Sequence, residues 1–325
     1  GGKLIFADDE TVNDIGELSK LIRNEGVDII QFTPSRILML LEIPEYAQCL
    51  KQVETVFIGG EALPQNTLNR LRKCTDARII NVYGPTETTV WSTYKDVTND
   101  DNVTIGRPLD NTDVYVIDKE NRLMFRNGTG ELSIGGLGVA NGYFNNSALT
   151  EERFITTDYA RGSIYKTGDL AGWDDNGNLF CLGRIDNQVK IRGYRVELEE
   201  IDHVILDYNS VCGRNIITRC VTIAKNIDGV NELYSFVELE KNISVFDCNE
   251  LKKYAESKLP FYMIPKAITF VDDIPFTGNG KVDRNALQKY ATEETVCCDN
   301  TDVFENETEK ILHRIWIDVL NVSHI

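Results

Sequence analysis

The sequence predicts a multi-domain α/β protein, and three changes of pattern along its 325 residues support that prediction. Residues 1–103 alternate helical segments with short apolar strands, which is typical of an α/β subdomain with a parallel sheet. Residues 104–184 carry short strands broken by Gly and Asn, and this pattern predicts a β-rich, barrel-like subdomain. Residues 185–292 mix strands and helices again, as in a small α+β domain. The polar run at 293–305 is typical of a linker.

The first subdomain contains apolar runs of two kinds. Helical periodicity predicts helices, whereas short apolar runs bounded by turn residues predict strands. Pro64 has a fixed φ and no amide hydrogen, so it suits the first position of a helix that runs to about Cys74. The other predicted helices are Val12–Glu25 and Pro34–Leu41, and the predicted strands are Asp28–Phe32, Val53–Ile58 and Arg78–Val82.

The next two pieces follow by the same criteria. In the barrel-like subdomain the predicted strands are 113–118, 130–136, 163–173 and 179–184. In the α+β domain the predicted helices are 197–206 and 248–258, and the predicted strands are 215–224 and 233–239.

The last segment, 306–325, places its large apolar side chains on one face of a predicted helix. These side chains are Ile311, Leu312, Ile315, Trp316, Val319 and Leu320. Such a helix packs either on its own domain or on a domain that begins here, and the pattern leaves both possibilities open.

Composition excludes several classes of function. The net charge is −17 and no Lys/Arg-rich stripe interrupts it, so nucleic acid is not an expected partner. No apolar stretch approaches the ~18 residues of a membrane span, and the eight cysteines form no CxxC pair. The three histidines are scattered without a zinc spacing. We therefore expect a cytoplasmic protein without a membrane partner.

The run Asn81–Thr89 is the most informative stretch for function. It follows an apolar strand, and the carboxyl ends of strands are where open α/β sheets bind their ligands. Tyr83, Thr86 and Glu87 supply an aromatic face, a hydroxyl and a carboxylate. Such a set could stack on a base, contact a phosphate and hold Mg²⁺, which prefers one or two carboxylates plus phosphate oxygens. Taken alone, the same residues could form a simple turn after a strand.

Four further motifs follow in a fixed order: Gly130–Tyr143, Tyr165–Leu170, Gly183–Ile201 and Asn279–Arg284. Together with Asn81–Thr89 they resemble the amino-acid-activating adenylation domains of nonribosomal peptide synthetases, within the adenylate-forming, AMP-binding superfamily. The segment Leu259–Pro265 favours this branch over acyl-CoA ligases and luciferases. The glycines of Gly130–Tyr143 have a simpler explanation, because they could be needed only for turns and tight packing.

The resemblance implies the reaction and its partners. We expect ATP- and Mg²⁺-dependent formation of an aminoacyl-AMP, followed by transfer to the phosphopantetheine thiol of a carrier domain. In the family, a phosphate loop and the aspartate that holds the substrate amino group lie upstream of the position of Gly1, so we expect a fragment that is inactive when isolated. The segment 306–325 resembles the first helix of that carrier domain, cut off before the modified serine.

The resemblance also assigns roles to individual residues. Lys281 corresponds to the catalytic lysine, which contacts both the substrate carboxylate and the α-phosphate; Glu87, also the metal ligand, and Thr86 are the other catalytic residues. Asp186 corresponds to the hinge of the small domain and Gly193 to the loop that lines the pantetheine tunnel. The predicted nucleotide-binding residues are Gly60, Glu61, Ala62, Asn81, Tyr83, Gly84, Thr86, Asp169 and Arg184.

Three basic residues beside Gly193 have a simpler alternative. Lys190, Arg192 and Arg195 could form a solvated face. Asn279–Arg284 contains a Gly-Lys pair but lacks the GxxxxGK[ST] pattern, so a phosphate-loop mechanism is rejected.

The resemblance places six residues around the substrate side chain: Gln31, Phe57, Gly59, Val82, Val90 and Trp91. None is charged, and an unpaired charged substrate would be costly to desolvate, so we expect a small neutral amino acid, most of all glycine. Two rival functions remain: an acyl-CoA or aryl-CoA ligase with the same adenylate chemistry, and a truncated, non-catalytic scaffold.

Overall fold

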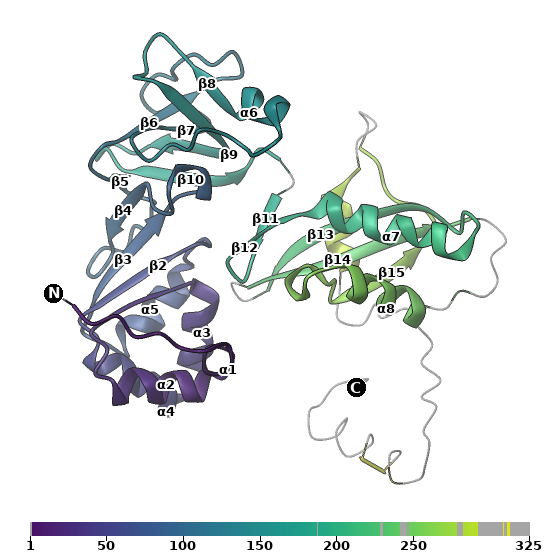
Figure 1. Cartoon of the computed structure of the whole chain (residues 1–325), viewed down its shortest axis with the longest axis horizontal. Helices are drawn as coiled ribbons and strands as arrows, with labels where there is room; N and C mark the ends of the chain where they lie inside the picture. The colour runs from purple at the N-terminus through teal and green to yellow at the C-terminus, as the bar shows by residue number, and fades with distance from the viewer. Residues whose placement is uncertain are drawn as a thin grey trace. The chain divides into compact units, whose positions relative to one another are not determined.

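The computed structural model describes residues 2–186, 188–227, 230–240, 246, 248–277, 282–291, 308 and 311–312. Within them the chain divides into two compact units: the first comprises the residues up to Val196 together with Val230, and the second comprises Glu197–Ile227 and the described residues from Asn231 onward (Figure 1). The predicted linker at 293–305, most of the predicted helix at 306–325 and the predicted catalytic Lys281 lie outside the described residues. No helix in the described ranges is both long and apolar enough to cross a membrane.

The first unit begins with a mixed sheet of strand order β1-β2-β3-β4-β5. Strands β1 (Ile29–Phe32), β2 (Thr55–Gly59) and β3 (Arg78–Tyr83) are parallel, as predicted. Strands β4 (Thr93–Asp96) and β5 (Arg107–Pro108) extend the sheet in antiparallel fashion. These two strands were not predicted from the sequence, and they run antiparallel because the short loop after β3 leaves no room for a crossover helix.

Helices cover this sheet and share one apolar core with it. The predicted helix Val12–Glu25 is instead two helices, because Asp14 accepts hydrogen bonds from the amides of Gly16 and Glu17 at 2.8 and 3.0 Å and caps the second one. Pro64 is the residue before the first turn of α5, not within it. The helical segments are α1 (Asp9–Asn13), α2 (Ile15–Asn24), α3 (Pro34–Glu42), α4 (Pro44–Ala47), η1 (Gln48–Gln52) and α5 (Gln65–Arg72). Fully buried core residues include Ile37, Leu40, Val56, Ile58, Leu68 and Leu71.

The barrel-like subdomain is an antiparallel sheet of order β10-β9-β7-β6, with β8 added to β9. Within the described ranges it is open, with β10 and β6 at its edges. Register shifts in β7 and β10 mark bulges, which bend a strand and increase its twist. The elements are β6 (Thr112–Ile117), β7 (Thr129–Gly136), α6 (Ser147–Arg153), β8 (Phe154–Thr156), β9 (Ser163–Trp173) and β10 (Leu179–Arg184).

A hairpin of β11 (Gln188–Ile191) and β12 (Tyr194–Glu197) follows β10. Its two-residue turn, Arg192 and Gly193, has φ of +49° and +85°. Two positive φ values are what a type I′ hairpin turn requires, and glycine adopts them without steric cost. The predicted tunnel residue Gly193 therefore lies at a tight turn tip.

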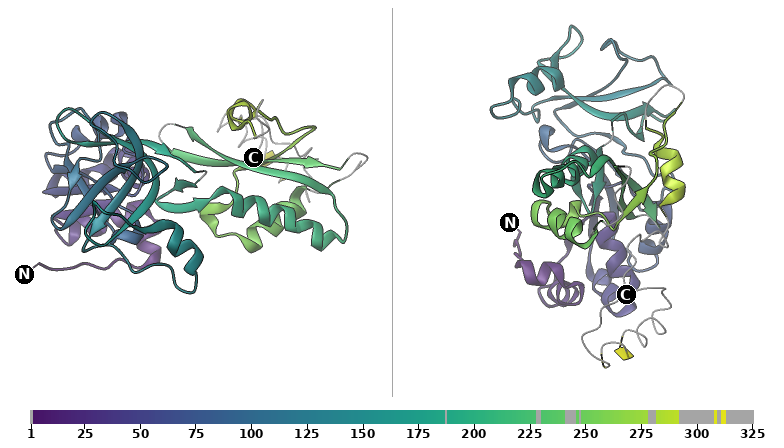
Figure 2. Two further views of the ribbon diagram at one scale, coloured as in Figure 1. Left: turned by 90° about the horizontal axis from the view of Figure 1, so that it is seen from above. Right: turned by 90° about the vertical axis from the view of Figure 1, so that its right-hand side faces the viewer.

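The second unit has a three-stranded sheet of order β13-β14-β15, with β14 and β15 parallel. Helices α7 and α8 lie on one face of this sheet and α9 on the other (Figure 2). The prediction of a small α+β domain is confirmed. Its elements are α7 (Leu198–Cys212), β13 (Ile217–Ile227), β14 (Val230–Leu239), α8 (Cys248–Lys258), η3 (Phe261–Met263), β15 (Ala267–Val271) and α9 (Arg284–Tyr290).

Candidate functional site

The candidate site is a cavity of about 340 Å³ in the first unit, next to the carboxyl ends of β2 and β3. This volume falls in the range of small-molecule sites. Residues of β9, β10 and the hairpin β11–β12 complete the wall. The sequence-predicted residues that line the cavity are Gly60, Tyr83, Gly84, Thr86, Val90, Trp91, Asp169, Arg184 and Gly193.

The loop after β3 is held in a strained conformation. Thr89 and Val90 have φ of +63° and +69°, a region that β-branched residues rarely adopt. A Cβ at Gly84 would lie 2.5 Å from the carbonyl oxygen of Val90, so the loop closes on itself only with glycine there. The Thr89 hydroxyl donates a hydrogen bond to the Gly138 carbonyl at 2.7 Å and ties this loop to the segment after β7. Strain of this kind concentrates at functional sites.

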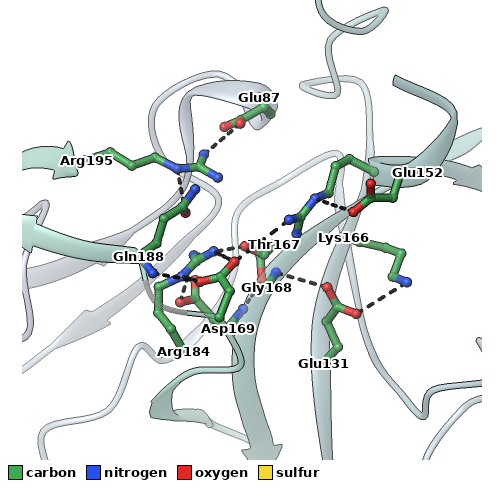
Figure 3. Close-up of polar contacts among 12 residues, drawn as sticks. Glu87, Glu131, Glu152, Lys166, Thr167, Gly168, Asp169, Arg184, Gln188 and Arg195 are labelled. Atoms are coloured by element: carbon green, nitrogen blue, oxygen red, sulfur yellow. Dashed lines mark hydrogen bonds and ion pairs between the residues drawn. The ribbon is translucent and has the colours of Figure 1, made fainter. Parts of the chain in front are cut away.

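Glu87, in the short helix η2 (Thr86–Thr88), is the centre of a polar network. Its Oε1 accepts hydrogen bonds from the hydroxyls of Tyr143 and Tyr165 at 2.7 and 2.8 Å. The same oxygen accepts one from Nη1 of Arg195 at 2.7 Å (Figure 3). Burial disfavours ionisation of Glu87, but the Tyr143 hydrogen bond and the Arg195 charge outweigh it, so its pKa lies below the ordinary value.

The second oxygen of this carboxylate is different. Oε2 of Glu87 is buried and has no hydrogen-bond partner among the described residues. A buried carboxylate oxygen without a partner is costly, and a cation with oxygen-rich coordination would satisfy it. Glu87 therefore fits the Mg²⁺ that the resemblance implies. No cluster of three or more His, Cys, Asp or Glu occurs in the described ranges, so further ligands would have to come from phosphate or water.

A second cluster joins β3, β9 and β10. The register of β9 and β10 sets Arg184 opposite Asp169. The Tyr83 hydroxyl donates a hydrogen bond to Oδ2 of Asp169. Nη1 of Arg184 lies 3.3 Å from Oδ1 of the same carboxylate (Figure 3). Arg184 also forms a two-pronged ion pair with Asp186, with both N···O distances 2.6 Å. Although burial opposes it, the Arg184 partner holds the pKa of Asp186 below its ordinary value.

The basic residues of the hairpin do not form a uniform solvated face. The Lys190 ammonium lies 5.5 Å from the centre of the Tyr83 ring, and burial lowers its pKa. Arg195 pairs with Glu87, and its Nε donates to the Gln188 side chain at 2.7 Å. Arg192 and Arg195 are both exposed, but Arg195 is held by these two contacts. The solvated-face alternative holds only for Arg192.

Four of the six predicted substrate-pocket residues lie on β1, β2 and β3, and the other two, Val90 and Trp91, lie in the loop after β3. The parallel ladder aligns Gln31 with Phe57, and Gly59 with Val82. The Trp91 indole donates a hydrogen bond to Oε1 of Gln31 at 3.1 Å. A Cβ at position 59 would lie 2.5 Å from the Val82 carbonyl oxygen and 2.8 Å from the Trp91 ring, so the indole covers Gly59. Val90 and Gln31 are exposed, whereas the other four are buried or partly buried.

Three predicted nucleotide-binding residues do not line the cavity. The buried Asn81 donates its side-chain amide to the Thr104 carbonyl at 2.8 Å. Glu61 accepts from the hydroxyl and amide of Ser35, at the start of α3. Ala62 is exposed. Their nucleotide contacts stay predictions.

Sequence reasoning did not assign a role to Tyr143, Tyr165 or Arg195. All three lie inside the quoted motifs, so a signal was present. Tyr143 and Tyr165 lie 56 and 78 residues from Glu87, and nothing in a linear sequence shows that their hydroxyls meet one oxygen.

Gly168 supports the Arg184 cluster through its missing side chain. Its φ is +76°, and an added Cβ would lie 2.5 Å from Nη2 of Arg184. We expect Gly168→Ala to destabilise the first unit by about 1–3 kcal/mol more than a matched control, because the guanidinium must move. Gly177→Ala is that control, since Gly177 has φ of +75° with open space around it. Thermal unfolding of both variants checks this, and equal melting temperatures would contradict it.

Comparison with known proteins gives consistent matches. The sequence profile of the family described as "AMP-binding enzyme" matches residues 1–144, and that of the "AMP-binding enzyme C-terminal domain" matches residues 215–281. Tyrocidine synthase 3 of Brevibacillus parabrevis is 36% identical over 330 residues, which cover 100% of this chain and 5% of that protein. The chain thus spans a small part of this relative's length.

Two solved structures share the fold. One is holo-PA1221, a nonribosomal peptide synthetase protein with adenylation and PCP domains, bound to a vinylsulfonamide inhibitor. It has a TM-score of 0.73 and 27% identity, covering 95% of this chain and 50% of that one. The other is holo-AB3403, a four-domain nonribosomal peptide synthetase bound to AMP and glycine. It has a TM-score of 0.53 and 33% identity, covering 98% of this chain and 23% of that one.

Proposed function

Because the chain belongs to the family of AMP-binding enzymes, we propose that it forms the later part of an amino-acid-activating adenylation domain of a nonribosomal peptide synthetase. One observation carries this proposal beyond family membership. Tyr83, Asp169 and Arg184, which are spread over about a hundred residues, line one cavity, and Glu87 contacts the cavity-lining Arg195. In this proposal, subdomains end at residues 103, 184 and 292, residues 293–305 form a linker, and residues 306–325 begin a carrier domain.

In this proposal the nucleotide binds across β3, β9 and β10. Tyr83 would stack on adenine, and the Asp169 carboxylate would accept hydrogen bonds from the ribose hydroxyls. Asp169 is already fixed by the Tyr83 hydroxyl and Arg184, so it need not reorganise when ribose binds. The planar Arg184 guanidinium suits oxygen acceptors of ribose and phosphate.

Glu87 would hold Mg²⁺ through the oxygen that has no protein partner among the described residues. When bound, this ion would neutralise phosphate charge near the leaving pyrophosphate. The Tyr143 and Tyr165 hydroxyls remain neutral donors, because burial raises the pKa of each. They fix the orientation of Glu87 without adding charge.

The reaction would proceed in two steps. The amino-acid carboxylate attacks the α-phosphorus of ATP, a new P–O bond forms, and pyrophosphate leaves. Lys281 would stabilise the charge that develops between carboxylate and α-phosphate. A carrier-domain thiol then attacks the acyl carbon, and AMP leaves as the thioester forms. Asp186 as the hinge, and Gly193 as part of the thiol entry path, belong to this proposal.

The substrate class follows from the residues next to the cavity. The Trp91 indole covers Gly59 and donates a hydrogen bond to Gln31. The side chains of Trp91, Gln31 and Val82 are all uncharged. This arrangement supports a small neutral amino acid, with glycine first, then alanine or a small polar residue. The glycine bound in holo-AB3403 agrees with this order.

Amino-acid-dependent pyrophosphate exchange on the full-length protein tests the proposal. We expect glycine to give the highest exchange rate, because the covered pocket excludes larger side chains. A preference for lysine, glutamate or tryptophan would contradict the pocket assignment but leave the ligase assignment intact. Exchange stimulated by a fatty or aromatic acid, with free CoA as acceptor, would contradict the peptide-synthetase assignment.

A further inference from the structure

The Glu87 carboxylate has two kinds of neighbour. Its side chain is only 9% exposed, so its negative charge needs compensation within the protein. The two tyrosine hydroxyls supply hydrogen bonds but no charge, and Arg195 supplies the counter-charge at 2.7 Å. In this structure an arginine of the hairpin therefore neutralises the residue that is proposed to bind the metal.

A hydrogen bond within the hairpin also orients the Arg195 side chain towards Glu87. Its Nε donates to Oε1 of Gln188, on the facing strand of the same hairpin, which leaves Nη1 directed at Glu87 (Figure 3). The side chain is 37% exposed, so its own charge can turn into solvent once another cation compensates Glu87. Glu87 cannot move in the same way, because the two tyrosines hold it.

We infer that Arg195 and the divalent metal are alternative counter-ions of Glu87, so that metal binding and the hairpin contact oppose each other. This inference rests on the proposed function. A guanidinium on Oε1 and a divalent cation on Oε2 of one carboxylate would repel each other, in surroundings that screen charge poorly. Because linkage between two binding events is reciprocal, the metal weakens the Arg195 contact as much as Arg195 weakens metal binding. Arg195 is a positioning residue by this inference.

The test measures metal affinity directly, with Mn²⁺ as a spectroscopic substitute for Mg²⁺. Free Mn²⁺ is followed by electron paramagnetic resonance during titration of the full-length protein with α,β-methylene-ATP. We expect Arg195→Gln to bind Mn²⁺ roughly tenfold more tightly than wild type, a size typical of linked sites. Arg192→Gln, which removes the same charge from the exposed turn of the same hairpin, is expected to leave the affinity unchanged. Arg195→Lys, which keeps the charge, should stay close to wild type.

Unchanged or weaker Mn²⁺ binding in Arg195→Gln, relative to Arg192→Gln, would overturn the inference while leaving the proposed function in place. Glu87→Gln separates the two ideas. If it fails to weaken Mn²⁺ binding, the metal role of Glu87 is wrong, and the inference falls with it.

A second measurement reads the reciprocal effect in the wild-type protein. Arginine modification by phenylglyoxal, quantified by mass spectrometry, reports how accessible each guanidinium is. We expect Mn²⁺ with α,β-methylene-ATP to increase labelling of Arg195 over that with the nucleotide alone, and to leave Arg192 unchanged. Equal labelling of Arg195 with and without Mn²⁺ would overturn the inference even if an Arg195 variant failed to fold.

Discussion

Lys281→Ala in the full-length protein is expected to slow aminoacyl-adenylate formation by roughly a hundredfold or more, the size seen when a group that stabilises developing charge is removed. The physical reason is that the ammonium group would interact with negative charge that appears only as the carboxylate attacks the α-phosphate. Pyrophosphate exchange measures this half-reaction. Thioester formation from supplied aminoacyl-adenylate is expected to lose much less, because that step does not create the same charge.

Lys289→Ala is the matched control, since Lys289 is an exposed lysine on α9, eight residues further along the chain. It should leave both half-reactions unaffected. If Lys281→Ala lowers the rates of both half-reactions equally, the assignment of this lysine to adenylation is wrong.

Asp169→Ala is expected to weaken AMP binding by about ten- to a hundredfold, because charge-assisted hydrogen bonds contribute roughly 1.5–3 kcal/mol each. The variant would also leave the Tyr83 hydroxyl and one contact of Arg184 without their acceptor. Calorimetric titration with AMP in the absence of metal measures the effect without any contribution from Glu87.

Asp113→Ala serves as the control, because Asp113 is an exposed aspartate on β6 of the same sheet. Its AMP affinity should equal that of wild type. An Asp169→Ala variant that binds AMP normally but turns over slowly would show that the carboxylate does not hold the ribose.

Local sequence patterns predicted the elements best where turn residues bound them sharply. The strands 163–173 and 179–184 and the helix 248–258 have the predicted bounds. Prediction failed where one polar side chain decided the outcome. Asp14 splits an otherwise continuous amphipathic helix by capping its second half, and periodicity alone does not reveal that choice.

The predicted nucleotide-binding residues also include some that the structure brings together and some that it does not. The motif order was enough to propose that Tyr83, Asp169 and Arg184 act together, and the structure brings them into contact. Asn81 lies in the same motif and, two residues before Tyr83, on the same face of β3, but its side-chain amide is already donated to the Thr104 carbonyl at 2.8 Å. That contact joins residues 23 positions apart, so the motif alone does not reveal it.

The sequence by itself determined the fold class and the family, since each depends on local periodicity or on motifs that are contiguous in the chain. Only the tertiary structure decided how Glu87 is compensated. Tyr143, Tyr165 and Arg195 lie 56, 78 and 108 residues away from it, and separate elements bring them to one oxygen. A buried carboxylate must find its donors wherever the packed strands present them, and that requirement acts in space, with no fixed spacing in the sequence.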